Sequence, residues 1–103
     1  MDKLLELEII PSAIFATNDL MAFGAMDSIR RPGLQIPDDI AIAGFDDIPF
    51  AAIYSPSLTT VTQPTLQMGS LAMQMLLDRI SGNITLEGRE VILQPTIVVR
   101  EST

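Results

Sequence analysis

Amide and carboxylate side chains follow three segments that have the composition of buried strands. They are Asn18, Asp46 and Gln63, and each stands at or just beyond the end of its segment. In an open α/β sheet, ligands bind in the crevice outside the carboxyl ends of the strands. Planar amides and carboxylates there offer donors and acceptors to the hydroxyl groups of sugars or nucleosides. We therefore predict that these three residues bind a small polyhydroxylated molecule.

Each of these residues also has a purely structural interpretation. Asn18 stands where a helix N-cap is expected, and Asp46 with Asp47 has the composition of a turn. Adjacent residues on an extended chain point to opposite sides, which argues against a close pair of catalytic carboxylates. A Mg²⁺-dependent hydrolase or receiver-like domain that uses Asp46 and Asp47 remains an alternative.

Composition excludes several other kinds of chemistry. The chain has no cysteine and no histidine, which excludes thiol nucleophiles, histidine-based triads and the usual transition-metal sites. Glycine-rich phosphate-binding motifs are absent. With 6 basic and 13 acidic residues the net charge is -7, so this segment would repel the phosphates of nucleic acid. We interpret the chain as a binding protein with no catalytic residue, metal or cofactor.

The sequence also bears on location. No apolar segment has the length of a transmembrane helix, and the first ten residues lack the pattern of a signal peptide. With the absence of cysteine, this predicts a cytoplasmic protein that makes no use of a membrane.

The candidate residues need a framework of alternating strands and helices to bring them together. Apolar or β-branched runs predict strands at 13–16, 40–45 and 58–63. Residues 89–100 predict two short strands, or one strand with a kink at Pro95, because proline cannot occupy a central paired position.

Helices are expected between these strands. One should run from about 19 to 31, where Pro32 and Gly33 end it, and another from about 64 to 80, with Pro64 in its first turn. Residues 2–9 have the pattern of the end of a helix. This order predicts an α/β domain with a mostly parallel sheet flanked by helices. Both longer helices carry more apolar surface than one sheet requires, which indicates either a crowded core or contact with a partner.

Five pieces of the chain, in order between residues 11 and 103, resemble one known family. They read AIFATNDLMAFGAM, GLQIPDDIAIAGFDDIP, PSLTTVTQP, MGxxAxxxLLDRI and IVVREST. They are similar to the C-terminal effector-binding region of LacI/GalR-type bacterial transcription regulators. The cores of these regulators resemble type I periplasmic sugar-binding proteins.

The resemblance implies a function that residue patterns alone do not give. It implies a small effector, a sugar or related metabolite, whose binding between two subdomains changes the affinity for DNA. Matching positions assign Asn18 and Asp46 to effector contact and Gln63 to the neighbourhood of the pocket. They assign the residues of a homodimer interface to helix and loop positions, namely Phe23, Met26 and Tyr54.

The resemblance covers only part of that family's architecture. The DNA-binding helix-turn-helix, the hinge helix, the N-terminal subdomain and one strand have no counterpart in this sequence. Residues 1–103 are therefore expected to be a partial C-terminal effector-binding and dimerisation subdomain, with DNA contacted only by the missing segment. We favour a fragment over a short gene product or a standalone subdomain. A fragment of a periplasmic-type sugar-binding transport protein is the alternative function.

Overall fold

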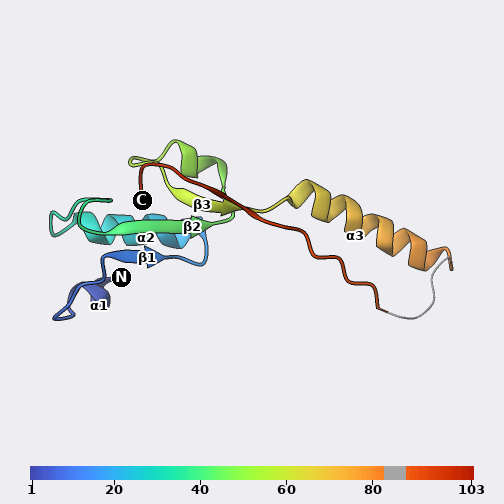
Figure 1. Cartoon of the computed structure of the whole chain (residues 1–103), viewed down its shortest axis with the longest axis horizontal. Helices are drawn as coiled ribbons and strands as arrows, with labels where there is room; N and C mark the ends of the chain where they lie inside the picture. Colours follow the sequence, from blue (N-terminus) through green and yellow to red (C-terminus); the bar gives the residue numbers. More distant parts are fainter. Residues whose placement is uncertain (83–87) are drawn as a thin grey trace. The chain divides into compact units, whose positions relative to one another are not determined.

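The computed structural model describes residues 1–82 and 88–103. It forms two compact units. Unit 1 comprises Met1–Thr62 and Thr96–Thr103, and unit 2 comprises Gln63–Pro95. Unit 1 holds the sheet, whereas unit 2 holds the helix α3 (Thr65–Ile80) (Figure 1).

Among the described residues, unit 1 contains a four-stranded sheet in the order β1-β2-β3-β4. The strands are Ala13–Phe15, Ala41–Phe45, Thr59–Thr62 and Thr96–Val98. β2 pairs in parallel with both β1 and β3, whereas β4 pairs antiparallel with β3. The sheet is therefore mostly parallel, as predicted, and the first three strands lie where their apolar and β-branched runs placed them.

Two expectations about the ends of the sequence are wrong. The only strand among the described residues of 89–100 is β4, which begins immediately after Pro95, so neither of our alternatives for that segment holds. Proline supplies no amide hydrogen for a ladder, which explains the late start of the strand. The end of a helix predicted at 2–9 is helical only over the single turn α1 (Asp2–Leu5), and an isolated turn gains little from the cooperativity that stabilises longer helices.

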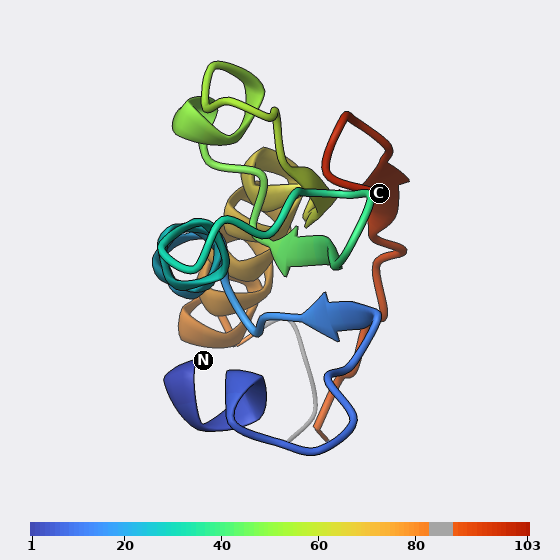
Figure 2. The same ribbon diagram turned by 90° about the vertical axis from the view of Figure 1, so that its left-hand side faces the viewer.

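The helix α2 (Asp19–Arg30) covers one face of the sheet. Figure 2 shows it nearly end-on beside β1 and β2. Its inward side chains Ala22, Met26 and Ile29 are completely buried, as is Ile42 of β2. Burial of each large apolar side chain stabilises the fold by about 1.5–3 kcal/mol, so this stripe is one of the main contributions to the stability of unit 1.

The helix begins and ends as the sequence predicts. Asn18 has extended backbone geometry, and its side chain accepts a hydrogen bond from the amide of Met21. The turn after the helix contains Gly33 with φ of 91°, a conformation that glycine adopts without steric cost. A short 3-10 helix, η1 (Pro49–Ala52), follows β2 and leads back towards β3.

Unit 2 consists of α3 and the described residues on either side of it. The predicted helix at 64–80 is confirmed at Thr65–Ile80. Its sequence has apolar residues on two sides, and none of its side chains is buried. Large exposed side chains include Leu66, Met73 and Ile80.

Candidate ligand-binding site

Asp46 is the first residue after β2, at the carboxyl edge of the parallel strands. Its amide donates to the carbonyl of Val61 at 2.9 Å, which ties it to β3. Its side chain is exposed. Its φ is 106° and that of Asp47 is 51°, two positive values that non-glycine residues rarely adopt. The chain therefore turns sharply at this edge and presents the Asp46 carboxylate on its surface.

Asn18 stands at the same edge, beyond the end of β1. Its amide oxygen accepts from the Met21 amide at 2.8 Å, so the N-cap interpretation of this residue is confirmed. That bond engages only the oxygen, and the NH₂ group is a further donor of the same side chain. Because β1 and β2 are parallel neighbours, Asn18 and Asp46 both follow strand ends on one edge of the sheet.

Asp19 connects these two positions. Its side chain is only 1% exposed. One carboxylate oxygen accepts from the hydroxyl of Thr60 on β3, and the other accepts from the amide of Ile48 at 2.8 Å. Asp19, which follows Asn18, is thus bonded to Ile48, which lies two residues after Asp46. This hydrogen bond ties the segment after β1 to the segment after β2.

Arg100 fixes the same turn from the other side. Its Nη2 lies 2.7 Å from Oδ1 of Asp47, and its Nη1 donates to the carbonyl of Leu58 at 2.8 Å. Both charged side chains are about one-fifth exposed, 18% for Arg100 and 20% for Asp47. Such a partly shielded pair is screened less by salt than a surface pair. Asp47 is therefore committed to a structural ion pair that anchors the turn.

Gln63 begins unit 2. It is half-buried, and its backbone carbonyl accepts from the amide of Thr65 at 2.8 Å. The structure thus brings together Asn18 and Asp46 on unit 1, while the predicted role of Gln63 stays a prediction.

The three residues expected at a dimer interface lie in different surroundings. Met26 is completely buried in the core of unit 1, where its side chain is not accessible to a second subunit. Phe23 is 8% exposed and packs against Tyr54, with ring centroids 4.6 Å apart, and against Phe50 at 5.3 Å. Phe50 is 47% exposed and forms the accessible part of this aromatic cluster.

Tyr54 joins the aromatic cluster to α2 through its hydroxyl. The hydroxyl donates to Oδ1 of Asp27 at 2.6 Å, and the guanidinium of Arg30 lies 5.5 Å from the ring centroid. Partial burial and the neighbouring Asp27 carboxylate raise the pKa of Tyr54, although Arg30 opposes this effect.

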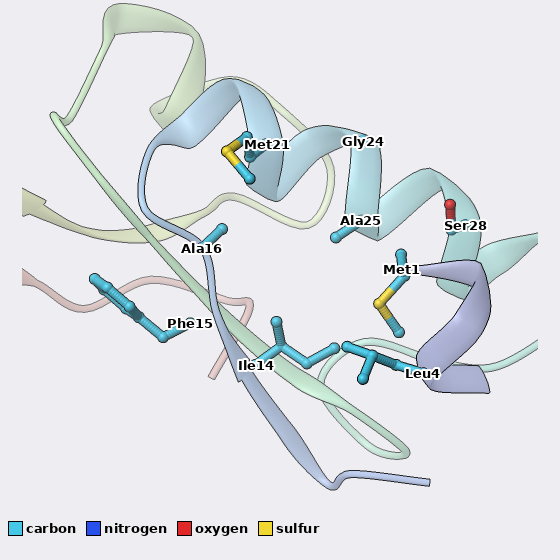
Figure 3. A pocket seen from close by; sticks show the side chains of 9 residues that line it. All are labelled: Met1, Leu4, Ile14, Phe15, Ala16, Met21, Gly24, Ala25 and Ser28. Atoms are coloured by element: carbon cyan, nitrogen blue, oxygen red, sulfur yellow. The ribbon is translucent and has the colours of Figure 1, made fainter. Parts of the chain in front are cut away.

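A hollow of about 310 Å³ lies elsewhere on unit 1, between α1, β1 and α2. Figure 3 shows Ile14 and Leu4 directed towards it, whereas Phe15 lies on the other side of β1. No carboxylate or amide side chain lines it, so it lacks the groups that orient a sugar. Its lining residues are Met1, Leu4, Ile14, Phe15, Ala16, Met21, Gly24, Ala25 and Ser28.

The described residues also bear on metal binding and on membrane insertion. Within residues 1–82 and 88–103, no three acidic side chains gather closely enough to hold a metal ion. No helix in that part of the chain has the length and apolar character needed to cross a bilayer.

Sequence reasoning missed the roles of Asp19, Thr60 and Arg100. An acidic residue such as Asp19 at a helix start is already favourable for its interaction with the helix dipole, so its type and position do not indicate a second role. A signal was nevertheless available in Gly44, because a glycine inside an apolar strand often marks a close approach. A Cβ at Gly44 would collide with the Asp19 carboxylate.

The whole chain, residues 1–103, matches the family model of the periplasmic binding protein-like domain. The transcriptional repressor PurR of Aliivibrio salmonicida is 40% identical over 102 residues, which are 99% of this chain and 30% of that protein. The ribose operon repressor of Haemophilus influenzae is 45% identical over 92 residues, 89% of this chain and 27% of that protein. The chain thus spans less than a third of the length of these curated relatives, which are named as repressors.

Solved structures show the same fold. The lac repressor dimer bound to operator and the anti-inducer ONPF matches with a TM-score of 0.88 and 33% identity, over 99% of this chain and 35% of that one. The transcriptional regulator CelR in complex with cellobiose matches with a TM-score of 0.85 and 39% identity, over 89% of this chain and 28% of that one.

Proposed function

Because the chain belongs to the periplasmic binding protein-like domain family, with LacI-type regulators among its relatives, we propose that it is the effector-binding part of such a regulator. One observation carries the proposal furthest. Asn18 and Asp46 leave adjacent parallel strands at one edge, and the bond between Asp19 and Ile48 ties the two positions together. The exposed Asp46 carboxylate is then a hydrogen-bond acceptor for ligand hydroxyl groups, and the Asn18 amide is a donor.

We infer that the effector is a sugar or a related metabolite. CelR was solved with cellobiose, and one relative is named for the ribose operon. Carboxylate and amide groups suit neutral hydroxyl-rich ligands better than phosphorylated ones, because a carboxylate repels a phosphate. The similarity to repressors favours regulation over the transport alternative.

The effector site can be tested on the 103-residue chain by nuclear magnetic resonance. Ribose, cellobiose and adenine are titrated separately into ¹⁵N-labelled protein, and amide shifts are followed residue by residue. We expect concentration-dependent shifts at residues 18 and 46–48 with at least one of these probes. A single subdomain buries only part of a ligand, so the expected affinity is weak.

The variant Asp46→Asn tests the assignment of the carboxylate. A hydrogen bond to a charged group contributes about 1.5–3 kcal/mol, so affinity for the probe that binds should fall roughly tenfold or more. Asp38→Asn, at an exposed position in another turn, is the matched control and should bind normally. Equal affinity in Asp46→Asn and the control would contradict the assignment.

We further propose that the aromatic cluster takes part in homodimerisation. Its accessible side chain is Phe50, which is 47% exposed, and Ile53, next to Tyr54 in the chain, is 76% exposed. Phe23 and Tyr54 pack against Phe50, whereas Met26 is buried in the core of unit 1. In sedimentation velocity, Ile53→Asp should shift a dimer of this chain towards monomer, and Ile92→Asp in unit 2 should not. A monomeric parent chain would contradict this part of the proposal.

DNA binding is proposed to reside outside this sequence, because its net charge of -7 opposes contact with phosphates. The role of the present chain is to couple occupancy of the effector site to that remote function.

A further inference from the structure

Asp19 is buried more completely than a helix-capping charge requires. An acidic residue in the first turn of a helix interacts favourably with the dipole while fully solvated. Here both carboxylate oxygens are instead used by groups far along the chain. The Thr60 hydroxyl is 41 residues later, and the Ile48 amide is 29 residues later.

The segment that Asp19 holds is the one that needs support. Asp46 and Asp47 both have positive φ values, which are unfavourable for residues with a side chain and persist only where the surroundings enforce them. Ile48, the next residue, donates its amide to Asp19. The bond therefore fixes the end of the turn and limits the conformations open to the two preceding residues.

The space around the Asp19 carboxylate is shaped to keep it in place. Gly44 of β2 provides the gap, since a Cβ there would overlap with Oδ1 of Asp19 and would touch Cδ2 of Leu58 at 3.0 Å. Thr60 bonds the same oxygen from β3. The carboxylate thus lies against the sheet, with α2, the turn after β2 and β3 all anchored to it.

We propose that Asp19 is a positioning residue for ligand binding, which fixes the backbone of residues 46–48 and so aims the Asp46 carboxylate. This inference rests on the proposed function for the role of Asp46. Asp19 itself has no access to the ligand, because it is 1% exposed. The Asp47–Arg100 ion pair holds the same turn independently, so loss of Asp19 should loosen the turn without unfolding unit 1.

The experiment compares three variants of the 103-residue chain with the parent. Asp19→Asn removes the charge while keeping the shape. Thr60→Val removes a hydroxyl that donates to Asp19 and also accepts from the amide of Asp47 at 3.4 Å, and Thr60→Ser restores it. Asp39→Asn is the matched control, because Asp39 also accepts a backbone amide, that of Gln35 at 2.7 Å, outside the site. Scalar and residual dipolar couplings at residues 46 and 47 report φ directly.

In the parent, Thr60→Ser and Asp39→Asn, we expect couplings at residues 46 and 47 that correspond to a fixed positive φ. In Asp19→Asn and Thr60→Val, we expect couplings averaged over several conformations. Affinity for the sugar or nucleobase probe should fall at least fivefold in those last two variants, while amide shifts of β1 stay unchanged. Unaltered couplings in folded Thr60→Val and Asp19→Asn would overturn the inference. If Asp19→Asn does not fold, Gly44→Ala decides, because its Cβ would displace the Asp19 carboxylate while the Thr60 hydroxyl is kept.

The outcomes separate the two proposals. A parent chain that responds to no probe at Asp46 would contradict the proposed function, and the couplings would still decide whether Asp19 fixes the turn. A parent that binds, together with variants that bind equally well, would contradict the inference alone.

Discussion

The hydroxyl of Ser102 donates to the carbonyl oxygen of Ile42 at 2.6 Å, although 60 residues separate them in the chain. The same hydroxyl accepts from the amide of Thr59 at 2.8 Å, and Ser102 is completely buried. The Ile42 amide in turn donates to the backbone carbonyl of Ser102 at 2.8 Å. One small side chain therefore joins two strands of the sheet to the segment that follows β4.

Ser102→Ala should destabilise unit 1 by about 1–3 kcal/mol, because it leaves the buried Thr59 amide without its acceptor. Chemical denaturation followed by circular dichroism measures the loss. Ser70→Ala on the exposed surface of α3 is the control and should change stability by less than about 0.5 kcal/mol. A loss in Ser102→Ala no larger than that of the control would show that the two bonds contribute nothing net.

Gly44→Ala should lower stability by about 1–3 kcal/mol, since its Cβ would overlap with the Asp19 carboxylate. Gly24→Ala makes the opposite prediction. A Cβ built at Gly24 would meet no atom within 4 Å outside its chain neighbours and its own helix backbone, and alanine is favoured over glycine inside a helix by roughly 0.5–1 kcal/mol. Thermal unfolding of the two variants should therefore shift in opposite directions, and a shared direction would contradict the close approach at Gly44.

Tyr54 should ionise above the usual tyrosine pKa of about 10, because burial and Asp27 raise its pKa. It is the only tyrosine in a chain without tryptophan, so the ultraviolet absorbance of tyrosinate reports this one group. Its contribution to stability is fully present below pH of about 10 and is lost as the pH rises through the raised pKa. Asp27→Asn should lower the ionisation midpoint, and an unchanged midpoint would contradict the bond.

Glu101 should titrate below the usual glutamate range, because the amide and the hydroxyl of Ser57 both donate to its carboxylate and lower its pKa. The stabilising contribution is present above the ordinary glutamate pKa and is lost as the pH falls through the lowered value. Carbon-detected resonance of the side-chain carboxyl follows this titration. Ser57→Ala keeps the amide donor and removes the hydroxyl, so the pKa should move only part of the way back.

The elements of this fold could be predicted because their signals are local. Asn18 before the helix, Gly33 after it and the β-branched run at Thr59–Thr62 each favour the observed structure through their own backbone preferences. The same reasoning placed Asn18 and Asp46 at one edge, because parallel neighbouring strands end at the same side of a sheet.

The hydrogen bonds and the ion pair that position the site could not be predicted in this way, because they join residues that are distant in the sequence. A carboxylate at a helix start has the same local pattern whether solvent or Thr60 is its partner, and only the fold decides between them. The same holds for Arg100, whose partner Asp47 is 53 residues earlier. The burial of Met26 could not be predicted for a related reason, since apolar residues on a helix do not reveal which side packs against the sheet.

The register of β3 and β4 has a consequence for the modularity of the chain. Thr62 and Thr96 are direct partners in the antiparallel ladder, so β3 ends and β4 begins at the same pair of residues. In topological terms, residues 63–95 are an insertion between the two strands of a β-hairpin. A tight Asn-Gly turn in place of residues 63–95 would close that hairpin without altering any pair of the ladder. The sheet and α2 would then form a minimal domain, and other segments could be inserted between β3 and β4.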